Sequence, residues 1–185
     1  MYTAQEILAR FANKKVLVTG GSGFLGSNLV SRLTEFGANI FATSRQGRQN
    51  TNDTKITWFK SSFENLTEAH AILQTVRPDI IYHLSGEVTA SNDSKFVLST
   101  FHSFVTSAAN ILTEATKIGC ERIVLTGSCT EPGELETPPG SPYAAAKSAA
   151  RIYGKMFCQC YKTPVVMVRP FVGYGQGQSA GKLIP

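Results

Sequence analysis

The stretch that decides the fold is Val16-Leu17-Val18-Thr19-Gly20-Gly21-Ser22-Gly23-Phe24-Leu25-Gly26. Its first residues form a short apolar run that predicts a buried strand, and apolar residues from Leu25 to Leu33 recur at helical spacing. Glycines between a strand and a helix let the backbone approach phosphate groups, to which the helix N-terminus presents unpaired N–H groups. The spacing Gly20-x-x-Gly23-x-x-Gly26 differs from the commonest dinucleotide fingerprint, Gly-x-Gly-x-x-Gly, so a tight turn that binds nothing is the alternative interpretation.

Strands and helices alternate through the rest of the chain. Apolar runs predict strands at residues 15–19, 39–43, 56–59, 79–84, 121–126 and 165–169, and helices are predicted at about 3–11, 25–35, 66–76, 95–118 and 143–161. Such alternation is typical of a parallel sheet covered on both faces, which predicts a doubly wound, Rossmann-like α/β fold with ligands at the carboxyl ends of its strands. With 185 residues and no visible linker, the chain is expected to form one domain, residues 1–185.

Composition argues against several classes of function. The net charge of +5 is dispersed, with no run of basic residues, so no nucleic-acid partner is expected. No apolar stretch approaches the roughly 20 residues that span a bilayer, and the N-terminus lacks the pattern of a signal peptide. The four cysteines form no Cys-x-x-Cys pair and the three histidines add no metal-like spacing. We therefore expect free thiols in a cytoplasmic protein without a metal site.

The end of the second predicted strand indicates the kind of cofactor. Sites for NAD usually place an acidic residue there, about 20 residues after the glycines, whereas sites for NADP use a basic residue for the 2′-phosphate. This chain has Thr43-Ser44-Arg45, with Arg48 nearby and no acid. Arg45 could pair with the phosphate and Ser44 could hydrogen-bond it, so NADP(H) is preferred and NAD(H) remains possible. The alternative is that Arg45 is a solvated loop residue.

A proton-transfer group is predicted from Tyr143-Ala144-Ala145-Ala146-Lys147. Residues four apart share one face of a helix, so Lys147 should lie beside the phenol and lower its pKa, as a general acid or base requires. Ser128, at the end of the preceding strand, could hydrogen-bond the same substrate oxygen. Tyr-x-x-x-Lys pairs also occur by chance, and the alternative is a surface tyrosine packed by the lysine stem. Its place after the fifth strand, with the glycine turn after the first, favours the catalytic interpretation.

Together these segments resemble the extended branch of the short-chain dehydrogenase/reductase family, the nucleotide-sugar epimerases, dehydratases and reductases. The matching segments are Thr19 to Gly26, His83-Leu84-Ser85-Gly86, Thr126-Gly127-Ser128, Ser141-Pro142-Tyr143 to Lys147, and Arg169-Pro170-Phe171 with Gly173 to Gly177. They span essentially the whole chain. Members of this branch continue into a smaller substrate domain, which by this resemblance is largely absent from a chain that ends at Pro185.

The resemblance implies a role for each matching residue. The residues expected at the cofactor are Gly20, Gly23, Phe24, Leu25 and Gly26 at the pyrophosphate, Ser62, Phe63, Leu84, Ser85 and Gly86 on the adenosine side, Lys147 at the nicotinamide ribose, and Pro170 and Phe171 near the nicotinamide. Ser128 and Tyr143 would hold the sugar oxygen at the carbon that gains or loses a hydride. The resemblance also implies a homodimer formed through the helix at 143–161.

The expected reaction is hydride transfer between NADP(H) and a carbon of a nucleotide-linked sugar. Dehydratases of the branch carry an Asp-Glu pair directly after the catalytic hydroxyl, and Cys129-Thr130 in that place disfavour elimination. A local likeness of residues 169–179 to GDP-6-deoxy-4-keto-mannose reductases favours 4-keto reduction. The alternatives are a 4-epimerase that keeps NAD tightly bound and, in another class, a dinucleotide-sensing protein without turnover.

Residues outside this group are expected to be structural. His83 is interpreted as a buried core histidine, because helices should cover its strand. Cys129 is interpreted as a small packing residue, since no second histidine is at hand to activate it as a nucleophile. The acids at 131, 134 and 136 are expected to be solvated, and Met156, Phe157 and Tyr161 to form a core or dimer stripe.

Overall fold

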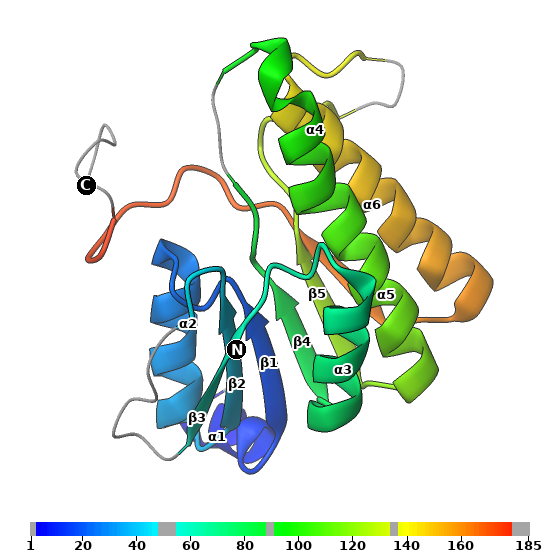
Figure 1. Ribbon diagram of the computed structural model, residues 1–185. Helices are drawn as coiled ribbons and strands as arrows, with labels where there is room; N and C mark the ends of the chain where they lie inside the picture. The colour runs from blue at the N-terminus through cyan, green and yellow to red at the C-terminus, as the bar shows by residue number, and fades with distance from the viewer. Residues whose placement is uncertain (1–2, 48–54, 88–90, 134–136, 179–185) are drawn as a thin grey trace.

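The computed structural model describes residues 3–47, 55–87, 91–133 and 137–178. Within these ranges six strands form one parallel sheet in the order β3-β2-β1-β4-β5-β6 (Figure 1). The strands are β1 (Lys15–Thr19), β2 (Asn39–Ser44), β3 (Ile56–Lys60), β4 (Ile80–His83), β5 (Arg122–Thr126) and β6 (Val165–Val168). Each was predicted from the sequence, with bounds that differ by at most one residue.

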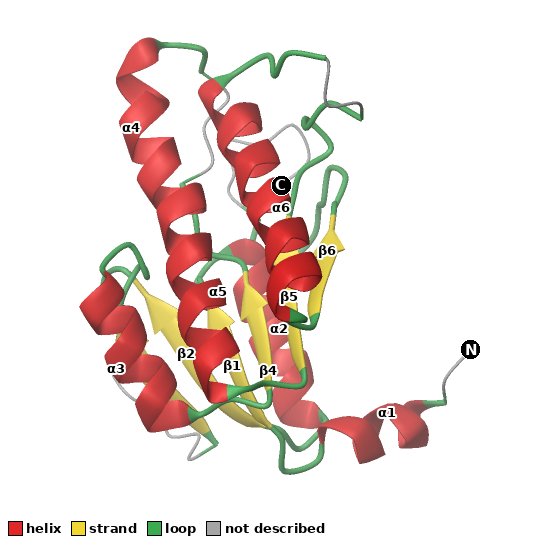
Figure 2. Cartoon of the chain, turned by 90° about the vertical axis from the view of Figure 1, so that its right-hand side faces the viewer, coloured by secondary structure: helices red, strands yellow, loops and turns green. Residues whose placement is uncertain are grey.

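Helices cover both faces of the sheet, which confirms the doubly wound, Rossmann-like fold. They are α1 (Ala4–Phe11), α2 (Phe24–Glu35), α3 (Leu66–Val76), η1 (Ser94–Phe96), α4 (Val97–Thr100), η2 (Phe101–Thr106), α5 (Ser107–Ile118) and α6 (Pro142–Tyr161). Figure 2 shows α3, α5 and α6 in front of the sheet and α2 behind it.

Alternation within the strands builds a hydrophobic core on each face. In β1, Val16 and Val18 pack with the residues of α2, while Leu17 between them packs on the opposite layer; all three are fully buried. The core on the α2 side also contains Val30, Leu33, Ala38, Ile40 and Ala42. The core under α3, α5 and α6 contains, among others, Phe63, Leu73, Ile81, Ile111, Leu112, Ile123, Leu125 and Phe157. Burial on both faces explains why the strands read as continuous apolar runs.

The helix predicted over residues 95–118 is not one uniform α-helix. It begins with the 3-10 turn η1, continues as α4 and widens into the π-helical segment η2 before α5. The hydroxyls of Thr100 and Ser107 donate to the carbonyls of Phe96 (2.7 Å) and Ser103 (2.6 Å) at the two ends of the wider segment. Such bonds to the preceding turn compete with the backbone ladder. Apolar spacing predicts a helix without reporting how many residues one turn contains, so this feature was missed.

The strand order reverses between β1 and β4, where open α/β sheets bind their ligands. Thr19, the last residue of β1, ties the two strand ends together: its hydroxyl oxygen accepts from the N–H groups of Leu84 and Ser85, each at 3.1 Å. The same hydroxyl lies 2.8 Å from Nδ1 of His83. His83 is buried, and burial lowers its pKa to about 3, which confirms the predicted core histidine.

After β6 the chain crosses the carboxyl edge of the sheet toward α2, as the orange segment in Figure 1 shows. Asn28 on α2 donates to the carbonyl of Gln176 at 3.4 Å. Gly173 lies against α2 as well, since a Cβ on it would be 3.6 Å from the ring of Phe24. The segment therefore brings residues after β6 beside the first turn of α2.

Candidate active site

The predicted glycine turn connects β1 to α2 at the reversal of strand order. Gly20 has a φ of +67°, and a Cβ on it would lie 2.9 Å from the backbone of Ser85. A Cβ on Gly26 would lie 2.1 Å from the carbonyl oxygen of Gly20, so α2 packs on the turn only because residue 26 has no side chain. Gly23 is the N-cap of α2 and contributes no side-chain cap. The N–H groups of the first turn are therefore left for an anion.

A pocket opens beside this turn. Its lining residues are Gly20, Ser22, Gly23, Ser44, Arg45, Ser61, Ser62, Glu64, Leu84, Ser85, Gly86 and Ser103. Eight of them were expected at the cofactor, whereas Ser22, Ser61, Glu64 and Ser103 were not. Ser22, Ser61 and Glu64 each follow the end of a strand, and this position could have predicted them as pocket residues, because the carboxyl ends of the strands meet at this edge of the sheet. Ser103 lies on η2, and no local pattern indicates it.

The lining of this pocket has the chemistry suited to the phosphates and ribose of a dinucleotide. Glycines keep open the space that a Cβ at Gly20 would fill, and the N-terminus of α2 offers uncapped N–H groups. Serine hydroxyls, the guanidinium of Arg45, Glu64 and Leu84 line the remaining wall. Backbone N–H groups, hydroxyls and a cation are the groups that bind pyrophosphate and ribose.

Besides Lys147, six residues expected at the cofactor do not line this pocket: Phe24, Leu25, Gly26, Phe63, Pro170 and Phe171. Leu25, in the first turn of α2, is 47% exposed, while Gly26 is buried against Gly20. Phe63 is fully buried in the core with α3 and α5, and only its backbone makes polar contacts, its carbonyl accepting from Asn110 at 2.9 Å. Phe171 follows β6 and is 83% exposed.

Arg45 lies where a site for NADP needs a cation. It follows the buried Ser44 at the end of β2, and its side chain is 67% exposed. Its Nη1 lies 4.0 Å from Oε2 of Glu87, at the outer limit of an ion pair. An exposed pair of this kind is weak, so a doubly charged phosphate could replace Glu87 as the partner of Arg45. Arg48 lies outside the described residues.

Tyr143, Lys147 and Ser128 come together at the carboxyl end of β5. Tyr143 and Lys147 lie one turn apart on α6, and Nζ of the lysine is 6.0 Å from the centre of the phenol ring. Ser128, two residues beyond β5, lies near enough to the phenol for its hydroxyl to influence the pKa of Tyr143. Lys147 is buried, donates to the carbonyl of Thr126 at 2.7 Å and lies 4.2 Å from the centre of the Phe104 ring.

The electrostatics correct the expectation that Lys147 lowers the pKa of Tyr143. Burial raises the pKa of the phenol, and the nearby hydroxyl of Ser128 opposes this rise without cancelling it. Burial also lowers the pKa of Lys147 from 10.5 to about 8. Both shifts have one cause, because desolvation disfavours the charged form of either group. At neutral pH, Tyr143 is therefore a protonated phenol, the form that can donate a proton.

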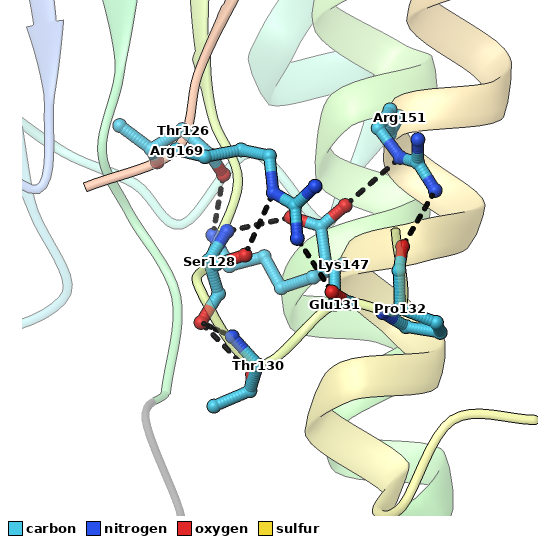
Figure 3. A network of polar contacts seen from close by, with 8 residues as sticks. All are labelled: Thr126, Ser128, Thr130, Glu131, Pro132, Lys147, Arg151 and Arg169. Carbon is cyan, nitrogen blue, oxygen red and sulfur yellow. Dashed lines mark hydrogen bonds and ion pairs between the residues drawn. The ribbon is translucent and has the colours of Figure 1, made fainter. Parts of the chain in front are cut away.

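Two neighbours of Ser128 also differ from their predictions. Glu131, expected to be solvated, is 3% exposed, and its Oε2 lies 3.0 Å from Nε of Arg151 on α6 (Figure 3). The partner was missed because the two residues lie far apart in the sequence and meet only through the fold. Cys129, expected to pack, is exposed. The acids at 134 and 136 lie outside the described residues.

Known proteins agree with this geometry. A family model described as NAD dependent epimerase/dehydratase family matches residues 16–185. The chain belongs to this family. Membership confirms the resemblance to the extended short-chain dehydrogenase/reductases, and it makes the glycine turn after β1 part of an NAD-binding fold.

Relatives within the family carry out different reactions. The dTDP-glucose 4,6-dehydratase of Haemophilus influenzae is 29% identical over 199 residues, which cover 92% of this chain and 59% of that protein. The UDP-glucose 4-epimerase of Mycolicibacterium smegmatis is 27% identical over 183 residues, covering 89% of this chain and 58% of that protein. The chain thus spans little more than half the length of these relatives.

Solved structures of other proteins share the fold. Pal from Bacillus thuringiensis superposes with a TM-score of 0.82 at 23% identity, covering 92% of this chain and 60% of that one. The UDP-glucose 4-epimerase of Thermus thermophilus, solved in complex with NAD, gives a TM-score of 0.74 at 24% identity and covers 84% of this chain and 54% of that one.

Within the described part of the chain, no three side chains of His, Cys, Asp and Glu come together in a way that could hold a metal ion. None of the helices described is long and apolar enough to cross a membrane.

Proposed function

We propose that this family member is an NADP(H)-dependent oxidoreductase that reduces the 4-keto group of a nucleotide-linked sugar, with residues 1–185 as its dinucleotide-binding domain. The observation that carries the proposal is the convergence of Tyr143, Ser128 and Lys147 at the carboxyl end of β5. The glycine turn lies on the same edge of the parallel sheet. A bound nicotinamide would supply the hydride.

The chain's own residues would supply the proton and hold the charge that develops on the sugar oxygen. Tyr143 would donate its phenolic proton to this oxygen as the hydride reaches the carbon. Ser128 would hydrogen-bond the same oxygen, with its Oγ held by the N–H of Thr130 at 3.1 Å. Lys147, fixed by the carbonyl of Thr126, would stabilise the tyrosinate that remains. Donors placed in advance around a developing oxyanion are usually the largest contribution to such catalysis.

Two features favour reduction over dehydration. Tyr143 stays protonated at neutral pH because burial raises its pKa, which suits a proton donor. The acid nearest to Ser128 is Glu131, and its carboxylate is already engaged by Arg151 and by the N–H of Ser128. A carboxylate held in this way is a poor base for removing a sugar proton, in line with the absence of the dehydratase Asp-Glu pair.

The preference for NADP(H) over NAD(H) is supported by Arg45. It is the cation on the pocket wall, and the adjacent Ser44 adds a hydroxyl at the same strand end. A guanidinium can bind the 2′-phosphate with two parallel hydrogen bonds.

A 4-epimerase with tightly bound NAD is the second candidate, because several relatives and structural neighbours are UDP-glucose 4-epimerases. A dinucleotide sensor without turnover is a third, although sensing would need neither the proton donor nor its lysine. The cysteines at 120, 129, 158 and 160 are free thiols, which supports a reducing, cytoplasmic location. We further propose a homodimer formed through α6.

The test is a fluorescence titration of the 185-residue chain with NADPH and with NADH. We expect tighter binding of NADPH, and Arg45→Gln should remove most of that preference while leaving NADH binding unchanged. Preference for NADH in the unmodified chain would overturn the assignment of Arg45 and place the epimerase first.

Tyr143→Phe then separates an enzyme from a sensor. For reduction of a nucleotide-linked 4-keto sugar, we expect turnover to fall by about 100-fold or more, the usual contribution of a general acid, with NADPH affinity retained. A sensor would have no turnover to lose. If neither cofactor binds, the same titration on a longer chain is the next measurement.

A further inference from the structure

Glu131 forms two polar contacts through one buried carboxylate. Its Oε1 accepts from the backbone N–H of Ser128 at 2.6 Å, and its Oε2 pairs with Nε of Arg151 at 3.0 Å. Figure 3 shows the carboxylate between the end of β5 and helix α6, with Ser128 on one side and Arg151 on the other. The side chain of Glu131 is fully buried, at 0% exposure, and that of Arg151 is 11% exposed. Glu131 therefore links Ser128 to α6.

Arg169 fixes the other side of Ser128. Its Nε donates to the carbonyl of Ser128 at 3.0 Å, and Nη2 donates to the carbonyl of Glu131. The N–H and the carbonyl of Ser128 are thus both held, one by an anion and one by a cation, from residues carried by different elements. Gly127 lets the three groups close, because a Cβ on it would lie 2.4 Å from Oε1 of Glu131 and 3.0 Å from Cγ of Arg169.

The carboxylate also acts on the two other groups of the site. Its negative charge favours the charged form of Lys147, opposing the effect of burial on the pKa of that lysine. It also contributes to the raised pKa of Tyr143. Two other titratable groups face Lys147 and Tyr143, namely His83 on β4 and Cys129 after β5. Burial, together with the charge of Lys147, lowers the pKa of His83 and keeps it neutral.

We propose that Glu131 is a positioning residue that fixes the backbone of Ser128 and supplies a buried negative charge to the surroundings of Lys147. This inference rests on the proposed function for the roles of Ser128 and Lys147. Glu131 acts through its hydrogen bond from the peptide N–H of Ser128 and through its charge. Arg151 provides the buried carboxylate with a positively charged partner at 3.0 Å, since an unpaired buried charge is costly.

Glu131→Gln tests the charge while keeping the shape. The amide oxygen of glutamine can still accept from the N–H of Ser128, so the loop has no steric reason to move. We expect the pKa of Lys147 to fall by roughly one unit, the scale of losing one nearby opposite charge. The measurement is a pH titration of carbon-13-labelled lysine side chains by NMR in the cofactor-free chain, with the Lys147 signal assigned from Lys147→Arg.

The direction of the shift separates this role from a merely structural one. If Glu131 only held the loop together, the substitution would let water reach Lys147, and its pKa would rise toward 10.5. The matched control is Glu114→Gln, which removes a carboxylate that is also buried but pairs with His70 and Lys117 between α3 and α5. A Lys147 pKa that rises, or that moves no more than in the control, overturns the proposal.

A second measurement needs no variant and decides the matter if Glu131→Gln does not fold. The N–H of Ser128 should exchange with solvent far more slowly than that of the exposed Gly133, because a buried carboxylate holds it. Equal exchange rates would overturn the positioning role. Both measurements use the chain without cofactor, so they are independent of the NADPH titration, whose failure would instead remove the proposed function.

Discussion

Gly26 shows how a single residue decides whether a cofactor site can form. It lies inside α2, where local propensity alone favours alanine by about 1 kcal/mol. In the fold, however, a Cβ at this position would lie 2.1 Å from the carbonyl oxygen of Gly20 and 2.9 Å from Cα of Gly21. The close approach of helix and turn therefore outweighs the preference of the helix.

Gly26→Ala is accordingly expected to destabilise the chain by roughly 1–3 kcal/mol, the usual cost of overpacking, rather than to stabilise it. Urea unfolding of the cofactor-free protein measures this change. Gly133→Ala is the matched control, since no atom of the described residues lies within 4 Å of a Cβ at this position, and it should change stability by no more than about 0.5 kcal/mol. A stabilised Gly26→Ala would mean that α2 does not pack on the turn as described.

The positions of the Glu131 and Phe63 side chains could not be predicted from residue type alone. An acid in a loop is usually solvated, yet Glu131 is buried because Arg151 and the N–H of Ser128 reach it from other parts of the fold. Phe63 follows β3 at the carboxyl edge of the sheet. Its backbone has a φ of +64°, and its side chain lies in the core and not in the pocket. Both outcomes depend on backbone direction and on distant partners.

The packing of helix α3 on helix α5 includes a polar contact between Glu114 and His70. Glu114 on α5 has a side chain that is 2% exposed, with His70 of α3 at 2.8 Å and Lys117 at 2.6 Å. The hydrogen bond from Lys117, followed by that from His70, holds the pKa of this carboxyl below its ordinary value of 4.5. The ionised form is therefore the one that stabilises the fold.

A pH dependence follows for Glu114→Gln. Because the folded pKa is depressed, the contribution of Glu114 is fully present above the unfolded pKa and disappears as the pH falls through the folded pKa. Near neutral pH we expect the variant to be less stable by about 1 kcal/mol, since both partners are more than half exposed. Urea unfolding at a series of pH values should show the difference vanishing in acid; a difference that persists there would mean that packing, not charge, is responsible.

The helices before α5 show a limit of pattern analysis at this scale. Within the π-helical η2, Phe104 is 3% exposed and occupies the space that a side chain at Gly86 would need, 1.8 Å from its Cβ position. The centre of its ring also lies 5.2 Å from that of Tyr143 and 4.2 Å from Nζ of Lys147. π-helical turns recur at functional sites, but no residue type in this segment predicts a π-helix.

At the scale of the whole molecule, large apolar side chains remain exposed on α4 and α6. Leu98 on α4 is 68% exposed, and Ile152 and Tyr153 on α6 are 48% and 42% exposed. Of the α6 residues expected to form a core or dimer stripe, Phe157 is buried and Met156 packs on the core, whereas Tyr161 is 57% exposed. The exposed apolar side chains suit the proposed homodimer.

Ile152→Asp on α6 should therefore shift the chain toward monomer in sedimentation velocity. Leu66→Asp is the control, because Leu66 is also exposed, at 51%, and begins α3, where an acid is favourable. A chain that sediments as a monomer before any substitution, or a dimer that both variants leave intact, would remove the proposed interface.

The sequence by itself determined the strands, most helices, the glycine turn and the pairing of Tyr143 with Lys147. These depend on short-range rules: the periods of strand and helix, and the freedom of glycine after a strand. Only the tertiary structure decided that Glu131 is buried beside Arg151, that the pKa of Tyr143 rises, and that Phe63 faces the core. Burial and pairing between distant residues set these properties, because desolvation depends on everything that surrounds a group and not on its neighbours along the chain.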